Sequence, residues 1–154
     1  MDRCDVLTTL RKHRISSTEQ RRRILAEIHS LDGTFTVASL KESGSLEGID
    51  EATIFRTVAL FLERGVVRSV GDSERGQVFE KNCEHNPAHG HFRCTVCGTW
   101  SCLPPFSGEE SGLLFTMLPD EYAAETVSVV FQGVCPRCFG GRETSGRRAF
   151  LPEK

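Results

Sequence analysis

The sequence predicts an α+β protein in which an N-terminal winged helix-turn-helix unit is followed by a small α/β unit. Helical periodicity occurs three times before Gly65 and is followed by two β-type runs, which is the element order of a winged helix. Cysteines and histidines then crowd among short strand-like runs. The predicted boundaries are 1–81 for the first unit, 82–139 for the second and 140–154 for a tail that we expect to be mobile.

Each predicted helix of the first unit has its own start signal. The predicted spans are 21–31, 37–42 and 51–64. Ser17–Gln20 has capping-box spacing before the first span, and Thr36 and Asp50 are the caps of the other two. In the third helix, an apolar stripe is formed by Ile54, Val58, Phe61 and Leu62.

The strands of both units are predicted from β-branched runs. VVRSV and QVFE, around the turn GDSERG, predict the hairpin wing. In the second unit, HFRCTVCGTWSCL predicts a strand pair, GEESGLLFTMLP a short helix and TVSVVFQGVC a last strand. At about 55 residues this unit is too small to be stable on its core alone, so it needs a staple, a partner subunit or both.

Composition narrows the class of protein. No apolar run approaches the length of a membrane span, and MDRCDVLTTLRKHR lacks the apolar region of a secretory signal. We therefore expect a cytoplasmic protein, in which thiols bind metal more often than they form disulfides. Residues 1–30 carry seven Lys/Arg against four Asp/Glu, within a chain of net charge −2. This patch could contact phosphates, or it could be a solvated helix face.

Two C-x-x-C pairs predict a structural zinc site. The pairs are Cys94/Cys97 and Cys135/Cys138. Four thiolates complete a tetrahedral sphere and leave no open position, which is typical of structural zinc. A redox or iron–sulfur centre is the alternative.

A second metal site is predicted from Cys83, His89 and His91. In an extended segment, His89 and His91 project to the same face, whereas Cys94 lies an odd number of residues further on and faces the other way. The turn NPAHG can fold Cys83 back toward the two histidines. Cys4 and Cys102 have no partner at ligand spacing, and we interpret them as a mobile thiol and a packed strand residue.

Several of these motifs, taken together and in order, resemble the ferric uptake regulator family. They are TEQR, ATIFRTV, LERG, HGHFRCTVCG and GVCPRC, from about residue 8 to 139. The resemblance implies a homodimeric, metal-dependent repressor, whose winged helix reads an AT-rich palindrome and whose second domain dimerises. It implies no enzymatic activity, no small-molecule substrate and no membrane partner.

The resemblance assigns the ligands residue by residue. Cys94, Cys97, Cys135 and Cys138 match the family's structural zinc site. His89, His91 and Glu80 match the sensing site between the domains. Cys83 falls where zinc-sensing members carry a cysteine, and since a thiolate beside imidazoles favours zinc over iron(II), the chain is most like a zinc uptake regulator.

Three departures from the family pattern affect these assignments. Thr34 stands where many members have a ligating histidine, so either Glu80 or His85 completes the sensing site, or the site is three-coordinate plus water. A further interleaved metal set is expected to be absent, because only Glu109 of it remains, with Ala88, Gly90 and Val127 at its other positions. Phe55 replaces a tyrosine of the recognition helix.

The predicted DNA contacts lie on the third helix and on a basic cluster. They are Thr53, Phe55, Arg56 and Thr57, with Arg21 toward the phosphate backbone. Phe55 could instead be a core aromatic. Metal at the sensing site would set the separation of the two recognition helices, which must match half-sites about one helical turn apart.

Three alternatives remain open. Glu80 also suits an iron- or peroxide-sensing member of the family, with iron(II) as the regulatory metal. A zinc hydrolase of the deaminase type would need H-x-E and P-C-x-x-C, but the chain has Cys83-Glu84-His85 and its proline lies inside Cys135-Pro-Arg-Cys138. A thiol redox switch is the third.

Overall fold

The computed structural model describes residues 4–124 and 127–140. Its N-terminal half contains four helices, α1 (Val6–Lys12), α2 (Glu19–Ser30), α3 (Val37–Glu42) and α4 (Glu51–Glu63), and three strands, β1 (Thr34–Phe35), β2 (Val67–Ser73) and β3 (Gly76–Lys81). The C-terminal half contains β4 (His89–Cys94), β5 (Trp100–Pro105), α5 (Gly108–Thr116), β6 (Val130–Gly133) and α6 (Pro136–Phe139). The expected tail lies outside the described residues, except for Gly140.

The helices begin where side-chain caps replace missing backbone partners. Thr18, Thr36 and Asp50 each accept a hydrogen bond from the backbone N–H three residues further on. Helix α1, which periodicity did not predict, is capped in the same way by Asp5 and buries only Leu10. A seven-residue helix with one buried side chain is too short to show a pattern.

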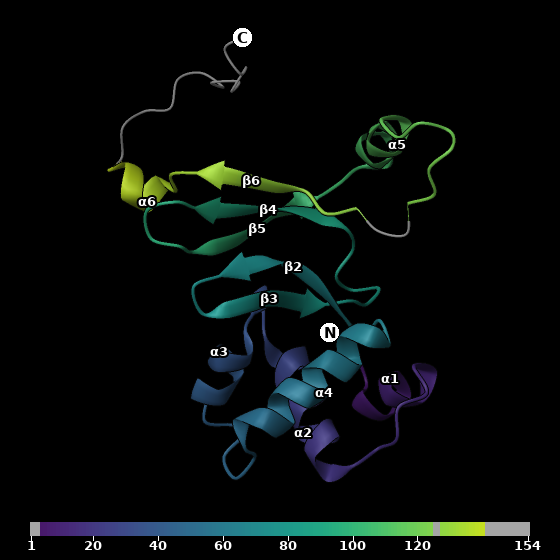
Figure 1. The fold of residues 1–154 in the computed structure, drawn as a ribbon, viewed down its shortest axis with the longest axis vertical. Coiled ribbons are helices and arrows are strands. Elements are labelled where there is room, and N and C mark those ends of the chain that lie inside the picture. The colour runs from purple at the N-terminus through teal and green to yellow at the C-terminus, as the bar shows by residue number, and fades with distance from the viewer. Residues whose placement is uncertain (1–3, 125–126, 141–154) are drawn as a thin grey trace.

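Two antiparallel hairpins form the centre of the molecule, one in each half. The first sheet has the strand order β1-β3-β2, and the second has the order β5-β4-β6, in which β6 pairs parallel to β4. In Figure 1 the second sheet is stacked over the β2–β3 hairpin, with the helices α1–α4 on the hairpin's other side. The segment between β3 and β4 therefore crosses from one half to the other.

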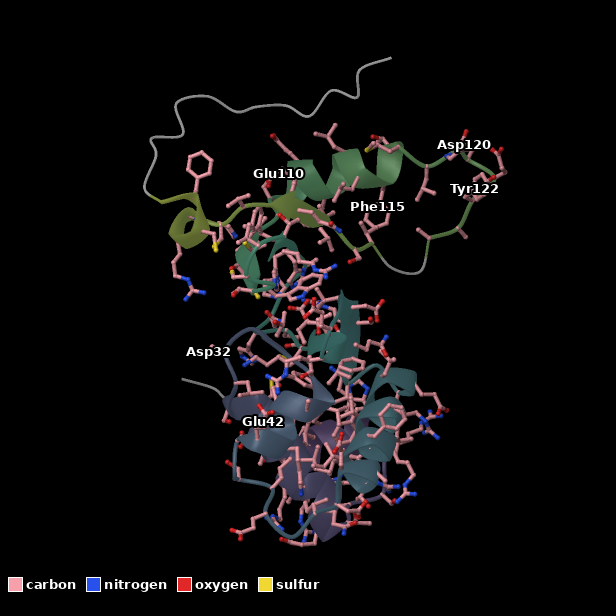
Figure 2. All side chains as sticks on the ribbon, turned by 60° about the vertical axis from the view of Figure 1, so that its left-hand side comes forward. Asp32, Glu42, Glu110, Phe115, Asp120 and Tyr122 are labelled. Carbon is pink, nitrogen blue, oxygen red and sulfur yellow. The ribbon has the colours of Figure 1, made fainter. Side chains whose placement is uncertain are left out.

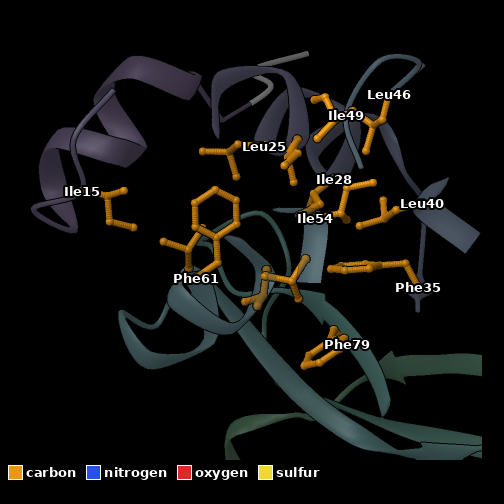
Figure 3. Packing of buried hydrophobic residues seen from close by; sticks show 14 of the residues in the cluster. Ile15, Leu25, Ile28, Phe35, Leu40, Leu46, Ile49, Ile54, Phe61 and Phe79 are labelled. Carbon is orange, nitrogen blue, oxygen red and sulfur yellow. The ribbon is translucent and has the colours of Figure 1, made fainter. Parts of the chain in front are cut away.

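The hydrophobic core belongs almost entirely to the N-terminal half. Its members come from α1–α4, the first sheet and the loops between them, and include Leu25, Ile28, Leu40, Ile54 and Phe61 (Figure 3). Helix α5 has no buried residue at all. The C-terminal half thus depends on something other than a core, as its size predicted.

The two halves meet at Trp100. A methyl group built on Gly71 of β2 would lie 2.6 Å from Cη2 of Trp100, so only glycine allows this approach. The guanidinium of Arg93 lies 6.0 Å from the indole centroid on the other strand of the hairpin. Within the described residues, none of the helices combines the length and the hydrophobicity that crossing a bilayer requires.

Candidate metal centres

Four cysteine sulfurs converge at the end of the second sheet. Cys94 ends β4, Cys97 lies in the turn toward β5, Cys135 caps α6 and Cys138 lies within it. Their sulfur atoms all lie within 4.8 Å of one another, and those of Cys97 and Cys135 are 3.8 Å apart. Zinc–sulfur bonds of about 2.3 Å give a tetrahedral edge of about 3.8 Å, so this spacing fits a zinc ion.

The backbone around these cysteines favours thiolates. The N–H groups of Cys97 and Cys135 donate to the sulfur of Cys94 at 3.5 and 3.4 Å, and they lower the pKa of Cys94. Hydrogen bonds with Thr99 lower the pKa of Cys97 to about 5. By contrast, the neighbouring Cys97 and Cys135 raise the pKa of Cys138 to about 12, because sulfurs this close compete for charge. A divalent cation would relieve that competition in all four.

A second ligand group lies between the two sheets. It consists of Glu80 on β3, His89 and His91 on β4 and Cys102 on β5, with ligand atoms within 4.8 Å of one another. The Nε2 atoms of both histidines lie 3.1 Å from the same oxygen, Oε2 of Glu80. Glu80 is only 2 % exposed. We call this group the Glu80 cluster.

The tautomer of His89 indicates that the Glu80 cluster fits a metal ion. Nδ1 of His89 lies 2.8 Å from the carbonyl oxygen of Pro87, and since a carbonyl can only accept, Nδ1 carries the proton. In the neutral ring, Nε2 then carries a lone pair, and this lone pair faces the Glu80 carboxylate. Nε2 is buried and has no hydrogen-bond partner. Two acceptors that face each other across 3.1 Å are the arrangement that a shared cation stabilises.

Arg68 of β2 already contributes a positive charge to this cluster. Its Nε donates to Oε1 of Glu80, while Oε2 is the oxygen that both histidines approach. Burial by itself would raise the pKa of Glu80, but hydrogen bonds from His91 and Arg68, together with the charge of Arg68, lower it to about 2. The carboxylate is therefore ionised, and Oε2, which both histidines approach, is the oxygen that a cation would share with them.

The structure corrects the predicted ligand set at Cys83. Cys83 lies in the turn after β3 and groups with Cys4 and His85, apart from the Glu80 cluster. The turn itself holds Cys83 in that group, because the N–H of Asn86 donates to the carbonyl of Cys83 at 2.9 Å and keeps Cys83 and His85 on one short loop. His85, the other candidate for the last ligand, follows Cys83 into that group.

Cys102 takes the place that was expected for Cys83. It pairs with His91 across the β4–β5 hairpin, so its side chain lies on the face that holds the histidines. Desolvation and the negative charge of Glu80 raise the pKa of this thiol. Sequence spacing alone did not identify it, because the pairing register depends on the loop between the strands. Thr34 pairs with Glu80 in the first sheet and is not among the ligands.

The outer face of α4 carries most of the predicted DNA-contact residues. Phe55 is 62 % exposed and is therefore not a core aromatic. Arg56 is exposed beside it and donates to Thr53, which in turn donates to Asp50. Arg21, at the start of α2, donates to the carbonyl of Ser16.

Thr57 does not belong to that outer face, which corrects its prediction. Thr57 is 6 % exposed and lies three residues after Ile54 and four before Phe61, within the stripe that packs on the core. Its hydroxyl is therefore not placed to contact DNA.

Comparison with known proteins is consistent with this architecture. A model of the ferric uptake regulator family matches residues 12–102. The Vibrio cholerae ferric uptake regulator is similar in structure, with a TM-score of 0.67 at 21 % identity over 85 % of this chain and 100 % of that chain. The Pseudomonas aeruginosa ferric uptake regulator with manganese gives 0.68 at 19 % identity, over 84 % and 96 %.

A zinc uptake regulator complexed with zinc and DNA is also similar, with a TM-score of 0.58 at 19 % identity over 86 % of this chain and 89 % of that chain. No curated protein matches the sequence significantly. At these identities the structural likeness concerns the fold alone, and it confirms the predicted α+β fold class, with a winged-helix domain followed by a small α/β domain.

Proposed function

This chain belongs to the ferric uptake regulator family, which consists of metal-responsive DNA-binding regulators and not of enzymes, and from that premise we propose that it is a zinc-responsive repressor of metal uptake genes. In this proposal it acts in the cytoplasm as a homodimer on an AT-rich palindrome. Cys94, Cys97, Cys135 and Cys138 hold a structural zinc, and the Glu80 cluster holds the regulatory ion.

The observation that carries the proposal is the position of the Glu80 cluster across the two sheets. Glu80 comes from the β3 strand of the wing, whereas His89, His91 and Cys102 come from the hairpin of the second domain. A bound zinc ion would supply one positive charge centre shared by both domains. The orientation of α4 relative to the second domain would then depend on whether these four side chains are held together.

The choice of zinc rests on the chemistry of the ligands. A thiol from Cys102 next to two imidazoles is a softer set than the oxygen-rich sets that suit harder ions. Iron(II) remains the second candidate, because Glu80 and the two histidines also form a two-histidine, one-carboxylate group. Ligation by Cys102 would therefore favour zinc, whereas a site without Cys102 would favour iron(II).

A second copy of the chain is the partner that we propose for the exposed apolar surface of the C-terminal half. Leu113, Phe115 and Met117 are 66 %, 55 % and 79 % exposed, although they stand in or directly after a helix. In Figure 2, Phe115 and Tyr122 lie at the end of the molecule that is remote from Glu42 of the DNA-binding half. A dimer through this surface would leave both copies of α4 free, and burial of these side chains would supply the missing core.

The outer face of α4 is our proposal for the DNA-reading surface. Arg56 can reach a base edge or a phosphate, and Phe55 can contact a thymine methyl group. Arg21 would contact the phosphate backbone. Metal would then increase the population of the conformation in which the two copies of α4 match the spacing of the DNA half-sites, which without metal is a minor state.

Fluorescence anisotropy with labelled operator DNA tests the proposal. Protein stripped at the Glu80 cluster with a mild chelator should bind more weakly than zinc-loaded protein, by about 5- to 150-fold, the usual range of allosteric coupling. Iron(II) added without oxygen is the comparison that separates the two metals. Equal binding by stripped and zinc-loaded protein would show that the cluster is not a switch.

A further inference from the structure

We propose a third zinc site, formed by Cys4, Cys83 and His85, that fastens the N-terminal segment to the connection between the two domains. The three ligand atoms lie within 4.8 Å of one another, although Cys4 is far from the other two in the sequence. None of the three belongs to the four-cysteine site or to the Glu80 cluster.

The spacing of these atoms fits a tetrahedral ion. The sulfur of Cys4 lies 3.4 Å from Nδ1 of His85. Zinc bonds of about 2.3 Å to sulfur and about 2.0–2.1 Å to nitrogen place two such ligands about 3.6 Å apart. Closing the site around an ion therefore requires only a few tenths of an ångström at this pair.

The backbone holds both ends of the cluster before any ion binds. The turn closed by Asn86 N–H and the Cys83 carbonyl keeps Cys83 and His85 on one short loop. On the other side, the carboxylate of Asp5 accepts from the N–H of Thr8 and starts α1 directly after Cys4. This arrangement lowers the entropy cost of bringing the ligands together.

A surface ion pair joins the same two segments a short distance away. Nζ of Lys12, at the end of α1, lies 3.7 Å from Oε1 of Glu84, the residue between the two ligands on the loop. Both side chains are exposed, so this pair contributes little by itself. It shows that the loop and α1 face each other along more than one residue.

Two thiols and one imidazole favour zinc over harder cations, and they leave one position for water. In the chain, residues 83–85 lie between Glu80 on β3 and His89 on β4, which both belong to the Glu80 cluster. An ion here would therefore restrain the loop that connects the domains. The expected role is to anchor this loop against the first domain.

Cobalt(II) titration of reduced full-length protein, zinc-loaded at the four-cysteine site, tests the proposal. Thiolate-to-cobalt absorption should correspond to about one more cobalt per subunit than in Cys4→Ser and in Cys83→Ser. His85→Ala should weaken that cobalt by at least about tenfold, since even outer-shell changes cost that much. Cys102→Ser, which alters only the Glu80 cluster, should keep this cobalt.

Limited proteolysis supplies an independent measurement. Added zinc should slow cleavage within the loop over residues 82–88 of the wild-type protein, and it should do so less in Cys4→Ser. Equal cobalt absorption in wild type and Cys4→Ser would overturn the site. So would loss of the extra cobalt in Cys102→Ser alone, or a Cys4–Cys83 disulfide that persists under reductant.

Discussion

The four-cysteine cluster and the Glu80 cluster differ in how their charge is balanced. In the first, neighbouring sulfurs compete for charge, as the pKa of about 12 for Cys138 indicates. In the second, Arg68 already pairs with Glu80, and the carboxylate is ionised with its pKa at about 2. The first needs an ion to become a fully deprotonated set, whereas the second keeps its charge balance without one.

The two clusters also differ in what they join. The cysteines connect β4 and its turn to α6, all within the second domain, where the described helix α5 buries nothing. The Glu80 cluster connects β3 to β4 and so joins the two domains. This difference suggests a permanent ion that supplies stability in one place and an exchangeable ion that controls orientation in the other.

Cys97→Ser should have the largest effect. Loss of one thiolate from a closed site removes tight zinc, and the second domain, which lacks a core of its own, should unfold and no longer dimerise. Zinc content, circular dichroism and sedimentation measure this. Cys102→Ser is the matched cysteine control for fold and dimerisation, because Cys102 lies outside the four-cysteine site. A folded, zinc-free dimer of Cys97→Ser would remove the first half of the comparison.

His91→Ala should abolish the zinc response but preserve the fold. The coupling between zinc and DNA, expected at about 5- to 150-fold, should fall to about one. Anisotropy titrations with and without zinc measure the coupling. His85→Ala is the matched control, because that histidine lies outside the Glu80 cluster and should leave most of the coupling intact. Loss of the dimer in His91→Ala would mean that the two clusters do not have separate roles.

Arg68→Gln should have a smaller effect, which raises the zinc affinity of the Glu80 cluster and lowers the stability of the zinc-stripped protein. Without the guanidinium, one positive charge next to the cluster is removed, so the zinc affinity of the cluster should rise. The same change leaves a buried carboxylate with fewer partners, so the zinc-stripped protein should lose about 1–3 kcal/mol of unfolding free energy. Zinc competition and urea denaturation measure the two. If both quantities were unchanged, Arg68 would have no part in balancing the cluster.

Gly71→Ala should have the smallest effect and tests the contact between domains that involves no metal. The added methyl group would meet Cη2 of Trp100 at 2.6 Å, which forces the indole to move. Because the indole is only half-buried, we expect a loss of about 1 kcal/mol, at the low end for overpacking. Urea denaturation checks this, with Gly108→Ala as a control, since a methyl group there meets nothing. If the zinc response of DNA binding fell sharply while the unfolding free energy changed by only about 1 kcal/mol, the Trp100 contact, and not the Glu80 cluster alone, would set the domain orientation.

The sequence predicted the elements whose signals are local. Helix α3 has the predicted bounds, and the first residues of α2 and α4 lie within two residues of their predicted starts. The alternation of side chains along β4 correctly separated the pair His89 and His91 from Cys94. These features depend on residues that are close together in the chain, which is why periodicity and caps reveal them.

The features that spacing did not reveal depend on long-range pairing. Strand β1 has two residues and exists through its register with β3. Cys102 reaches the Glu80 cluster through its register opposite His91, and Cys4 reaches Cys83 across the whole first domain. Thr57 is different, because its position in the apolar stripe of α4 was visible at i+3 from Ile54 and could have been used.

The most direct test of the central claim is zinc content per subunit, measured before and after a mild chelator in Cys4→Ser, in which the proposed third site is removed. The same samples are assayed for DNA binding. We expect about two zinc ions before treatment and about one after it, with the dimer intact and DNA affinity reduced. Loss of both ions together, or release of one ion with no change in DNA affinity, would contradict the division between a permanent and an exchangeable site.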